Sequence, residues 1–211
     1  MSVFSAKVSI DDTRTVVGVT TTLPEVSYFS ATFRGTSLLG NWEPPELTLA
    51  DEGVEILTDF MCGLSSAAFF LSQQAADYFA NLPQKGFELL ETRFNNRKES
   101  FLVLNVTTVA DCLDKKVTRI TYSSTDPQRV LLIQQPRFIE ERIPEVLAFK
   151  VPEDTSRIFV TDAFVELVIA KKLTGIYFED PSTEEVFLKK ALFGTPFLPI
   201  FAKQRKKLFD G

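Results

Sequence analysis

The alternation of apolar and polar positions predicts a strand-rich beginning to this 211-residue chain. Short runs of β-branched and aromatic residues, separated by turn-forming residues such as Asp11, Asp12 and Pro24, are typical of strands. A nearly continuous apolar run at 101–109 predicts a strand that is buried on both faces. The full set of strands expected from this pattern is 7–10, 15–20, 27–33, 101–109, 119–122, 130–133 and 146–150.

Two stretches of the chain, 67–90 and 156–179, share one pattern at a constant offset of 89 residues. Each begins with an apolar strand that ends at Ser72 or Thr161, whose hydroxyl suits the cap of a following helix. Apolar residues then recur at helical spacing, and Gly86 or Gly175 stands where a helix exit favours a left-handed residue. The pattern predicts two similar strand–helix–strand units, with chance likeness as the alternative. The expected fold class is mixed α+β, with more strand than helix.

Composition indicates a folded, soluble protein. Hydrophobic residues make up 45% of the chain and charged residues 24%, the balance of an ordinary globular domain. No secretory signal is evident, and no apolar run reaches the roughly 20 residues that a membrane-spanning helix needs. The two cysteines, Cys62 and Cys112, are too few and too far apart for a disulfide framework. We therefore expect a reducing, cytoplasmic location.

The residue types that are missing exclude most routes to catalysis. Histidine is absent, which removes Ser-His-Asp and Cys-His nucleophilic sites and His-ligated zinc. Neither a GxxxxGK[ST] phosphate loop nor a GxGxxG motif is present. A carboxylate pair could still catalyse hydrolysis, but no spacing singles one out. We therefore expect no enzyme activity, no cofactor and no metal.

The charge of the chain is unevenly distributed. The net charge is −5, from 23 basic and 28 acidic residues. Residues 186–211 hold six of the basic residues and one acidic residue, so the remaining 17 basic and 27 acidic residues give the body −10. An acidic body favours a basic protein partner and disfavours nucleic acid. Solubility alone is an equally good explanation of this charge.

Three runs of the sequence resemble the motifs of a known family. The run Gly-Asn-Trp-Glu-Pro-Pro-Glu-Leu at 40–47 resembles its opening motif, which contains a tryptophan and a proline. The run FLVLNVTTVADCLD at 101–114 is similar to a central segment, and 158–178 is similar to a C-terminal segment. The family is an immunity-protein family of bacterial polymorphic toxin systems, whose namesakes are myxobacterial immunity proteins.

The resemblance implies a protein that binds and neutralises a cognate toxin by occluding its working surface. The toxin would be encoded by an adjacent gene. For the chain itself we expect no nucleic-acid or membrane partner, while a homo-oligomer is left open. We expect an N-terminal β segment over 1–35, an immunity-protein-like region over 36–180, and a C-terminal extension with a basic end over 181–211. The alternatives are a carboxylate-dependent hydrolase acting on a toxin product, and a self-associating scaffold protein.

Candidate partner-binding residues come from a tryptophan in a proline-rich loop and from short acidic runs. Tryptophan is enriched at binding hot spots, and carboxylates could dock on a basic toxin surface. The plainer interpretations are a tryptophan packed on the core and solvated acidic turns. Asp111 and Asp114, which flank Cys112, are interpreted as structural. The candidate residues are Trp42, Glu43, Asp51, Glu52, Glu179, Asp180, Glu184 and Glu185.

Overall fold

The computed structural model describes residues 1–8, 32–47, 58–61, 65–82, 86–94, 101–183, 186–189 and 198–199. The α-helices whose bounds lie within these residues are α2 (Gln73–Ala80) and α3 (Asp162–Ala170), and a short 3-10 helix, η1, spans Glu140–Arg142. The strands are β1 (Val3–Val8), β2 (Glu46–Leu47), β3 (Phe60–Met61), β4 (Ala68–Ser72), β5 (Phe87–Glu91), β6 (Arg93–Phe94), β7 (Phe101–Val106), β8 (Arg119–Tyr122), β9 (Val130–Gln134), β10 (Ala148–Val151), β11 (Asp154–Thr161), β12 (Ile176–Glu179), β13 (Val186–Lys189) and β14 (Leu198–Pro199).

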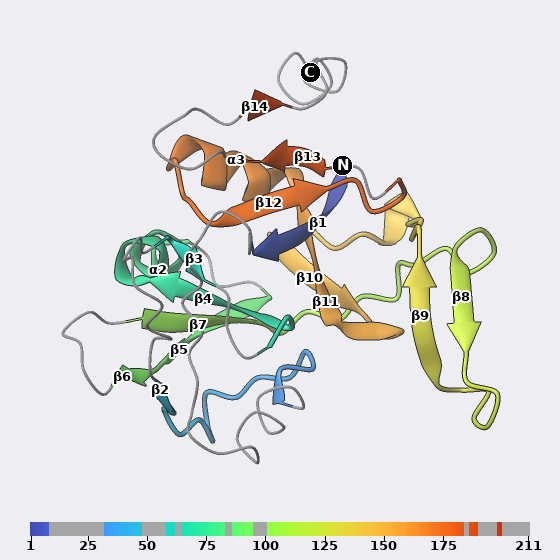
Figure 1. Cartoon of the computed structure of the whole chain (residues 1–211), viewed down its shortest axis with the longest axis horizontal. Coiled ribbons are helices and arrows are strands. Elements are labelled where there is room, and N and C mark those ends of the chain that lie inside the picture. Colours follow the sequence, from blue (N-terminus) through green and yellow to red (C-terminus); the bar gives the residue numbers. More distant parts are fainter. Residues whose placement is uncertain are drawn as a thin grey trace, which may run out of the picture.

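The prediction of a strand-rich α+β fold is confirmed (Figure 1). Strand β8 coincides with the expected 119–122, and β7, β9 and β10 overlap the strands expected at 101–109, 130–133 and 146–150. The strand expected at 15–20 and most of that at 27–33 lie outside the described residues.

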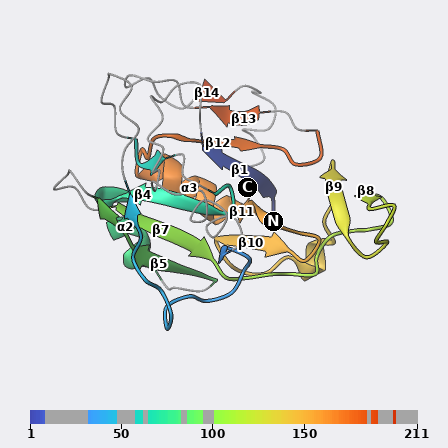
Figure 2. The ribbon, with the colours of Figure 1, turned by 60° about the horizontal axis from the view of Figure 1, so that its bottom comes forward.

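Two sheets dominate the described residues. The larger has six strands in the order β10-β11-β1-β12-β13-β14, and the smaller has four in the order β3-β4-β7-β5. Two small two-stranded sheets, β2-β6 and β8-β9, accompany them. In Figures 1 and 2 the six-stranded sheet lies beside the four-stranded sheet, and the β8-β9 hairpin projects from the side of the six-stranded sheet.

Four strands of the larger sheet match the smaller sheet in order and register. In the smaller sheet β7 lies between β4 and β5 and is antiparallel to both, and in the larger sheet β1 lies likewise between β11 and β12. Strand β3 flanks β4 as β10 flanks β11, with Phe60 opposite Leu71 and Ala148 opposite Val160. Residues of β4, α2 and β5 correspond to those of β11, α3 and β12 at the same offset of 89.

One apolar core joins the two sheets. The buried faces of both sheets and of both helices contribute to a single cluster, because each helix has one apolar side to bury. Its centre is aromatic: the Phe79 ring lies 5.5 Å from that of Phe164, and the Phe60 ring lies 6.2 Å from Phe79 and 6.1 Å from Phe164. The described parts of the two sheets therefore fold against each other around this core.

The helix ends follow the predicted pattern only in part. The Ser72 hydroxyl caps α2 by accepting from the Ala75 amide at 3.1 Å. The equivalent expectation for Thr161 is wrong, because its hydroxyl donates instead to the Val146 carbonyl at 2.9 Å and makes no cap. Gly86 and Gly175 do adopt positive φ, but each stands just before a strand. Lys172, with φ of 54°, takes the left-handed position at the exit of α3.

The β8-β9 hairpin is anchored at its base by a third, smaller apolar cluster. Ile133 of β9 is buried there with Phe149 and Phe159 of the six-stranded sheet. Further out, Leu131 and Leu132 are 56% and 48% exposed. The hairpin therefore presents apolar side chains on an element that projects into solvent.

Candidate functional site

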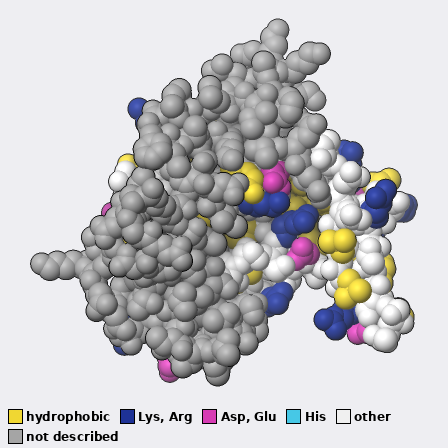
Figure 3. All heavy atoms as spheres, in the orientation of Figure 1, with side chains coloured by type: hydrophobic (Ala, Val, Ile, Leu, Met, Phe, Trp, Pro, Cys, Tyr) yellow, Lys and Arg dark blue, Asp and Glu magenta, His cyan; other side chains and the backbone are white. Residues whose placement is uncertain are grey.

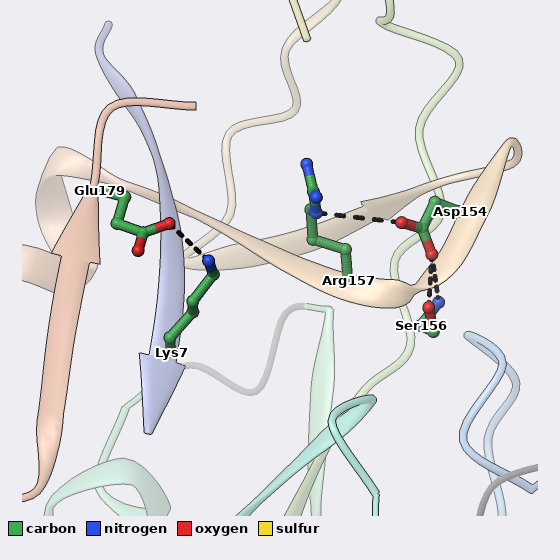
Figure 4. Close-up of polar contacts among 5 residues, drawn as sticks. All are labelled: Lys7, Asp154, Ser156, Arg157 and Glu179. Atoms are coloured by element: carbon green, nitrogen blue, oxygen red, sulfur yellow. Dashed lines mark hydrogen bonds and ion pairs between the residues drawn. The ribbon is translucent and has the colours of Figure 1, made fainter. Parts of the chain in front are cut away.

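Glu179 lies at the end of β12 and is bound to a neighbouring strand. Its side chain points toward β1, where a carboxylate oxygen lies 2.6 Å from Nζ of Lys7 (Figure 4). The two strands are paired in register, with Tyr177 opposite Lys7, so the ion pair runs diagonally across the sheet. Glu179 is only 8% exposed, so a partner would meet the Lys7 ammonium as well as this carboxylate.

Asp180 is half-buried and shapes the turn that follows β12. One oxygen of its carboxylate accepts hydrogen bonds from the Ser182 amide at 2.8 Å and from the Ser182 hydroxyl at 2.6 Å. This local pattern is typical of an aspartate that stabilises its own turn. Glu184 and Glu185, the other members of the predicted acidic run, lie outside the described residues.

Trp42 packs against the apolar surface of the four-stranded sheet. Its ring lies 5.9 Å from that of Phe33, and its indole N–H donates to the Glu91 carbonyl at 2.7 Å. The side chain is half-buried, while the adjacent Glu43 is exposed. Asp51 and Glu52 lie outside the described residues.

The predicted site residues that are described fall into two separate places. Trp42 and Glu43 precede β2, which pairs with β6, whereas Glu179 and Asp180 end β12 in the six-stranded sheet. In Figure 1, β2 lies in the lower left part of the molecule and β12 lies in its upper part. Their role in partner binding stays a prediction, and they form two surfaces rather than one.

A cleft that the sequence pattern does not indicate lies between the β8-β9 hairpin and the turn from β10 to β11. It encloses about 270 Å³. Figure 3 shows basic, acidic and apolar side chains gathered in the hollow beside the projecting hairpin. The cleft is lined by Arg34, by the four residues Val130–Ile133 of β9, and by Pro152, Glu153 and the four residues Asp154–Arg157.

Within the described residues, most charged groups in the cleft have a charged partner, but the Arg34 guanidinium does not. Asp154 faces the Arg157 guanidinium at 3.9 Å and also accepts from the Ser156 amide and hydroxyl (Figure 4). Glu153 binds Nζ of Lys115 at 2.5 Å. Arg34 is exposed, and the contact described for its side chain is a 3.4 Å hydrogen bond to the Thr155 hydroxyl.

Lys150 lies buried beneath this part of the surface, and no carboxylate of the described residues is bonded to its ammonium. Its ammonium donates two hydrogen bonds of 2.8 Å, to the carbonyls of Phe33 and Ala67, and the residue is 0% exposed. Burial, together with the positive charge of Arg34, lowers the pKa of Lys150 to about 8, while Asp154 opposes the shift. The Lys150 ammonium therefore binds the carbonyl of the residue just before Arg34 and adds positive charge behind the cleft.

Other titratable groups in the described residues have structural surroundings. Cys112 is fully buried, and desolvation raises the pKa of its thiol to about 11, so the reactive thiolate is disfavoured. Asp111 lies 3.4 Å from Lys115, and Asp114 accepts from the Lys116 amide in a turn. The part of the chain that the structure describes contains no cluster of three or more acidic or cysteine side chains able to hold a metal ion.

Sequence patterns do not predict the cleft, because the segments that line it are far apart in the sequence. Arg34, β9 and the start of β11 come from three segments with no shared motif, and only the folded topology brings them together. The sequence feature that could have drawn attention to this surface is the pair of consecutive leucines in β9. The structure leaves both exposed, which is unusual for a strand of a solvated hairpin.

The family comparison identifies the class of protein. The sequence model of an immunity protein family (Imm11) matches residues 16–183. The chain therefore belongs to the Imm11 immunity protein family, as the resemblance in its motifs implied. No curated protein matches the chain in sequence. Within the described residues, no helix is long and apolar enough to cross a membrane.

Proposed function

We propose that this chain binds a cognate bacterial toxin and neutralises it by covering the toxin's working surface, without a catalytic step of its own. The observation that carries the proposal is membership of the immunity protein family, by a match that extends over most of the chain. Such a mechanism needs a complementary surface with a few buried anchors, and needs neither cofactor nor metal. The toxin is encoded next to this chain, and the complex forms in the cytoplasm.

The surface of the described residues suits this role. The cleft is concave and polar, while the hairpin beside it exposes Leu131 and Leu132. Interfaces of this kind combine apolar side chains that are buried on association with charged groups that set orientation. Glu43 and Asp180, which lie on two separate surfaces, each offer a carboxylate for contact with a basic toxin surface.

The test is co-expression of this chain with the product of the adjacent gene, scored by host survival, followed by titration of the purified pair. Blocking predicts that protection saturates at one chain per toxin and that the two proteins co-purify. Protection at far less than one chain per toxin would instead support a hydrolase that acts on the toxin's product. If the neighbouring protein is harmless and no complex forms, the proposal is wrong.

The acidic residues are tested in the same titration. Glu43→Lys and Asp180→Asn should each weaken the complex, because the first reverses an exposed charge and the second removes one while keeping the turn's acceptor. Glu145→Lys is the matched control for Glu43→Lys, since Glu145 is also exposed and lies outside the predicted site. Equal effects of Glu43→Lys and Glu145→Lys would show general charge steering rather than a site.

A further inference from the structure

The cleft beside the hairpin is bordered by the edges of two strands. Four consecutive residues of β9 and four consecutive residues of β11 line it. Because successive side chains of a strand point to opposite faces, consecutive residues can share one cleft only if the backbone edge of the strand borders it. Four strand residues extend about 13 Å, enough for a short extended peptide.

The edge of β9 that faces the cleft has pairing capacity left. Within the described residues β9 pairs with β8 alone, and β8 lies on the outer side of the hairpin (Figure 1). The ladder between β10 and β11 also shifts register, from Phe149 opposite Phe159 to Val151 opposite Asp154. A strand edge with unpaired backbone groups, such as the edge of β9 that faces the cleft, is a template for an added strand.

The charges in the cleft favour an occupant that brings one carboxylate. Asp154 is matched by Arg157 and Glu153 by Lys115, and among the described residues the exposed Arg34 guanidinium makes one long hydrogen bond, to Thr155. The buried ammonium of Lys150 adds a second positive charge behind Arg34. A carboxylate can bind a guanidinium through two parallel hydrogen bonds, which fixes orientation as well as adding energy.

The edge of β9 has both donors and acceptors to satisfy. A peptide backbone supplies N–H donors for the carbonyls of β9, together with acceptors for its amides. A phosphodiester backbone supplies acceptors alone, so the cleft suits a polypeptide better than a nucleic acid.

We propose that the cleft receives an extended, acidic segment of the cognate toxin, which adds as a strand to the edge of β9 and places a carboxylate on the Arg34 guanidinium. Leu131 and Leu132, which line the cleft and are exposed, then pack against apolar residues of the same segment. This proposal rests on the proposed function and names the surface that performs it.

The experiment measures the affinity of the full-length chain and its variants for the toxin encoded by the adjacent gene. Arg34→Glu should weaken the complex by about tenfold or more, because it removes a charge-assisted pair and sets like charges together. Arg119→Glu is the matched control, since Arg119 is exposed on β8 and does not line the cleft. It makes the same change in net charge and should weaken the complex less than threefold.

Hydrogen exchange provides a second readout that does not depend on a variant. In the complex, the amides of residues 130–133 should exchange more slowly than in the free chain, as expected for an edge strand that gains a partner. Unchanged exchange at 130–133 together with wild-type affinity of Arg34→Glu would overturn the proposal while leaving toxin binding intact. If the wild-type chain binds no toxin, both proposals are wrong.

Two other occupants are separated by the same variants. A labelled single-stranded DNA oligonucleotide that binds the wild-type chain but not Arg34→Glu would assign the cleft to a nucleic acid. A dimer of the wild-type chain that Arg34→Glu dissociates, measured by native mass, would assign the cleft to a second copy. Either result would overturn the toxin segment as occupant.

Discussion

Gly86 and Gly175 adopt the same left-handed φ of 84°, and each lies close to the residue two positions before a strand of the other sheet. Gly175, just before β12, packs on Thr58 and Phe60, at the start of β3. Gly86, just before β5, packs on Val146, which precedes β10 by the same two positions as Thr58 precedes β3. The glycine before β5 of the four-stranded sheet thus lies close to the segment that enters β10, and the glycine before β12 of the six-stranded sheet lies close to the start of β3.

Substitution of these glycines should destabilise the protein in a defined order. A Cβ at Gly175 would lie 2.1 Å from the Phe60 carbonyl oxygen, which cannot move without the strand, and φ is unfavourable as well. Gly175→Ala should therefore lower the free energy of unfolding by about 2–4 kcal/mol. At Gly86 the nearest atom is the Thr108 hydroxyl, so Gly86→Ala should cost less. Urea denaturation measures both.

Gly40→Ala is the control for these substitutions. An added Cβ at Gly40 would meet no atom within 4 Å, so the free energy of unfolding should change by less than about 0.5 kcal/mol. If Gly40→Ala lowered the free energy of unfolding as much as Gly175→Ala, the effect would not be caused by the close approach of Gly175 to Phe60.

The prediction of two strand–helix–strand units rests on signals that are local in the sequence. Strand, cap, helix and glycine follow one another within about 24 residues, and each has its own sequence signal. What the pattern could not give is the strand placed between the two strands of each unit. Strand β1 pairs with β11 and β12, more than 150 residues further along the chain, and no local periodicity specifies that choice.

The same limit applies to the candidate site. In the sequence, Glu179 belongs to an acidic run. In the structure, the register of β1 against β12 places Lys7 beside Glu179, and the Glu179 side chain is buried. Arg34 carries no motif, and it lines the cleft because the Lys150 ammonium fixes the carbonyl of the preceding residue. Charges could be counted from the sequence, but their pairing depends on contacts between distant segments.

Glu88 should be a main support of the segment that leads to Trp42. Its carboxylate is 3% exposed and accepts from the Ser37 hydroxyl at 2.6 Å, the Leu38 amide at 2.7 Å and the Asn105 amide group at 2.8 Å. Glu88→Ala leaves these donors without their acceptor and should lower the free energy of unfolding by about 3 kcal/mol or more. Glu91→Ala, exposed on the same strand, is the control and should change it by less than about 0.5 kcal/mol.

Trp42 can be tested as a packing residue and as a binding residue in one variant. Trp42→Ala removes the contact with the Phe33 ring and the hydrogen bond to Glu91, and should lower the free energy of unfolding by about 2–3 kcal/mol. Leu39→Ala, at an exposed residue of the same segment, should have little effect. Unchanged stability of Trp42→Ala with lost toxin binding would instead identify Trp42 as an anchor for the partner.

The buried Lys150 should give the stability of the protein a distinctive dependence on pH. Its pKa is about 8 in the folded chain and near 10.5 when unfolded, so between these values the unfolded chain binds more protons. The penalty for burying the charge is complete below pH 8 and disappears by about pH 10.5. The contribution of Lys150 to the free energy of unfolding therefore rises with pH, by up to about 1.4 kcal/mol per pH unit.

Lys150→Met separates this effect from the opposite contribution of Cys112. The raised pKa of the Cys112 thiol, about 11 against 9.0, keeps the folded chain protonated longer and lowers stability between those pH values. Cys112 is present in both chains, so the difference between wild type and Lys150→Met cancels it. That difference, from urea midpoints and slopes at pH 7.5, 8.5, 9.5 and 10.5, should grow in favour of the wild type as the pH rises. A difference that stays constant over this range would mean that Lys150 keeps its ordinary pKa in the folded protein, and that its two carbonyl partners and Asp154 offset the cost of burial.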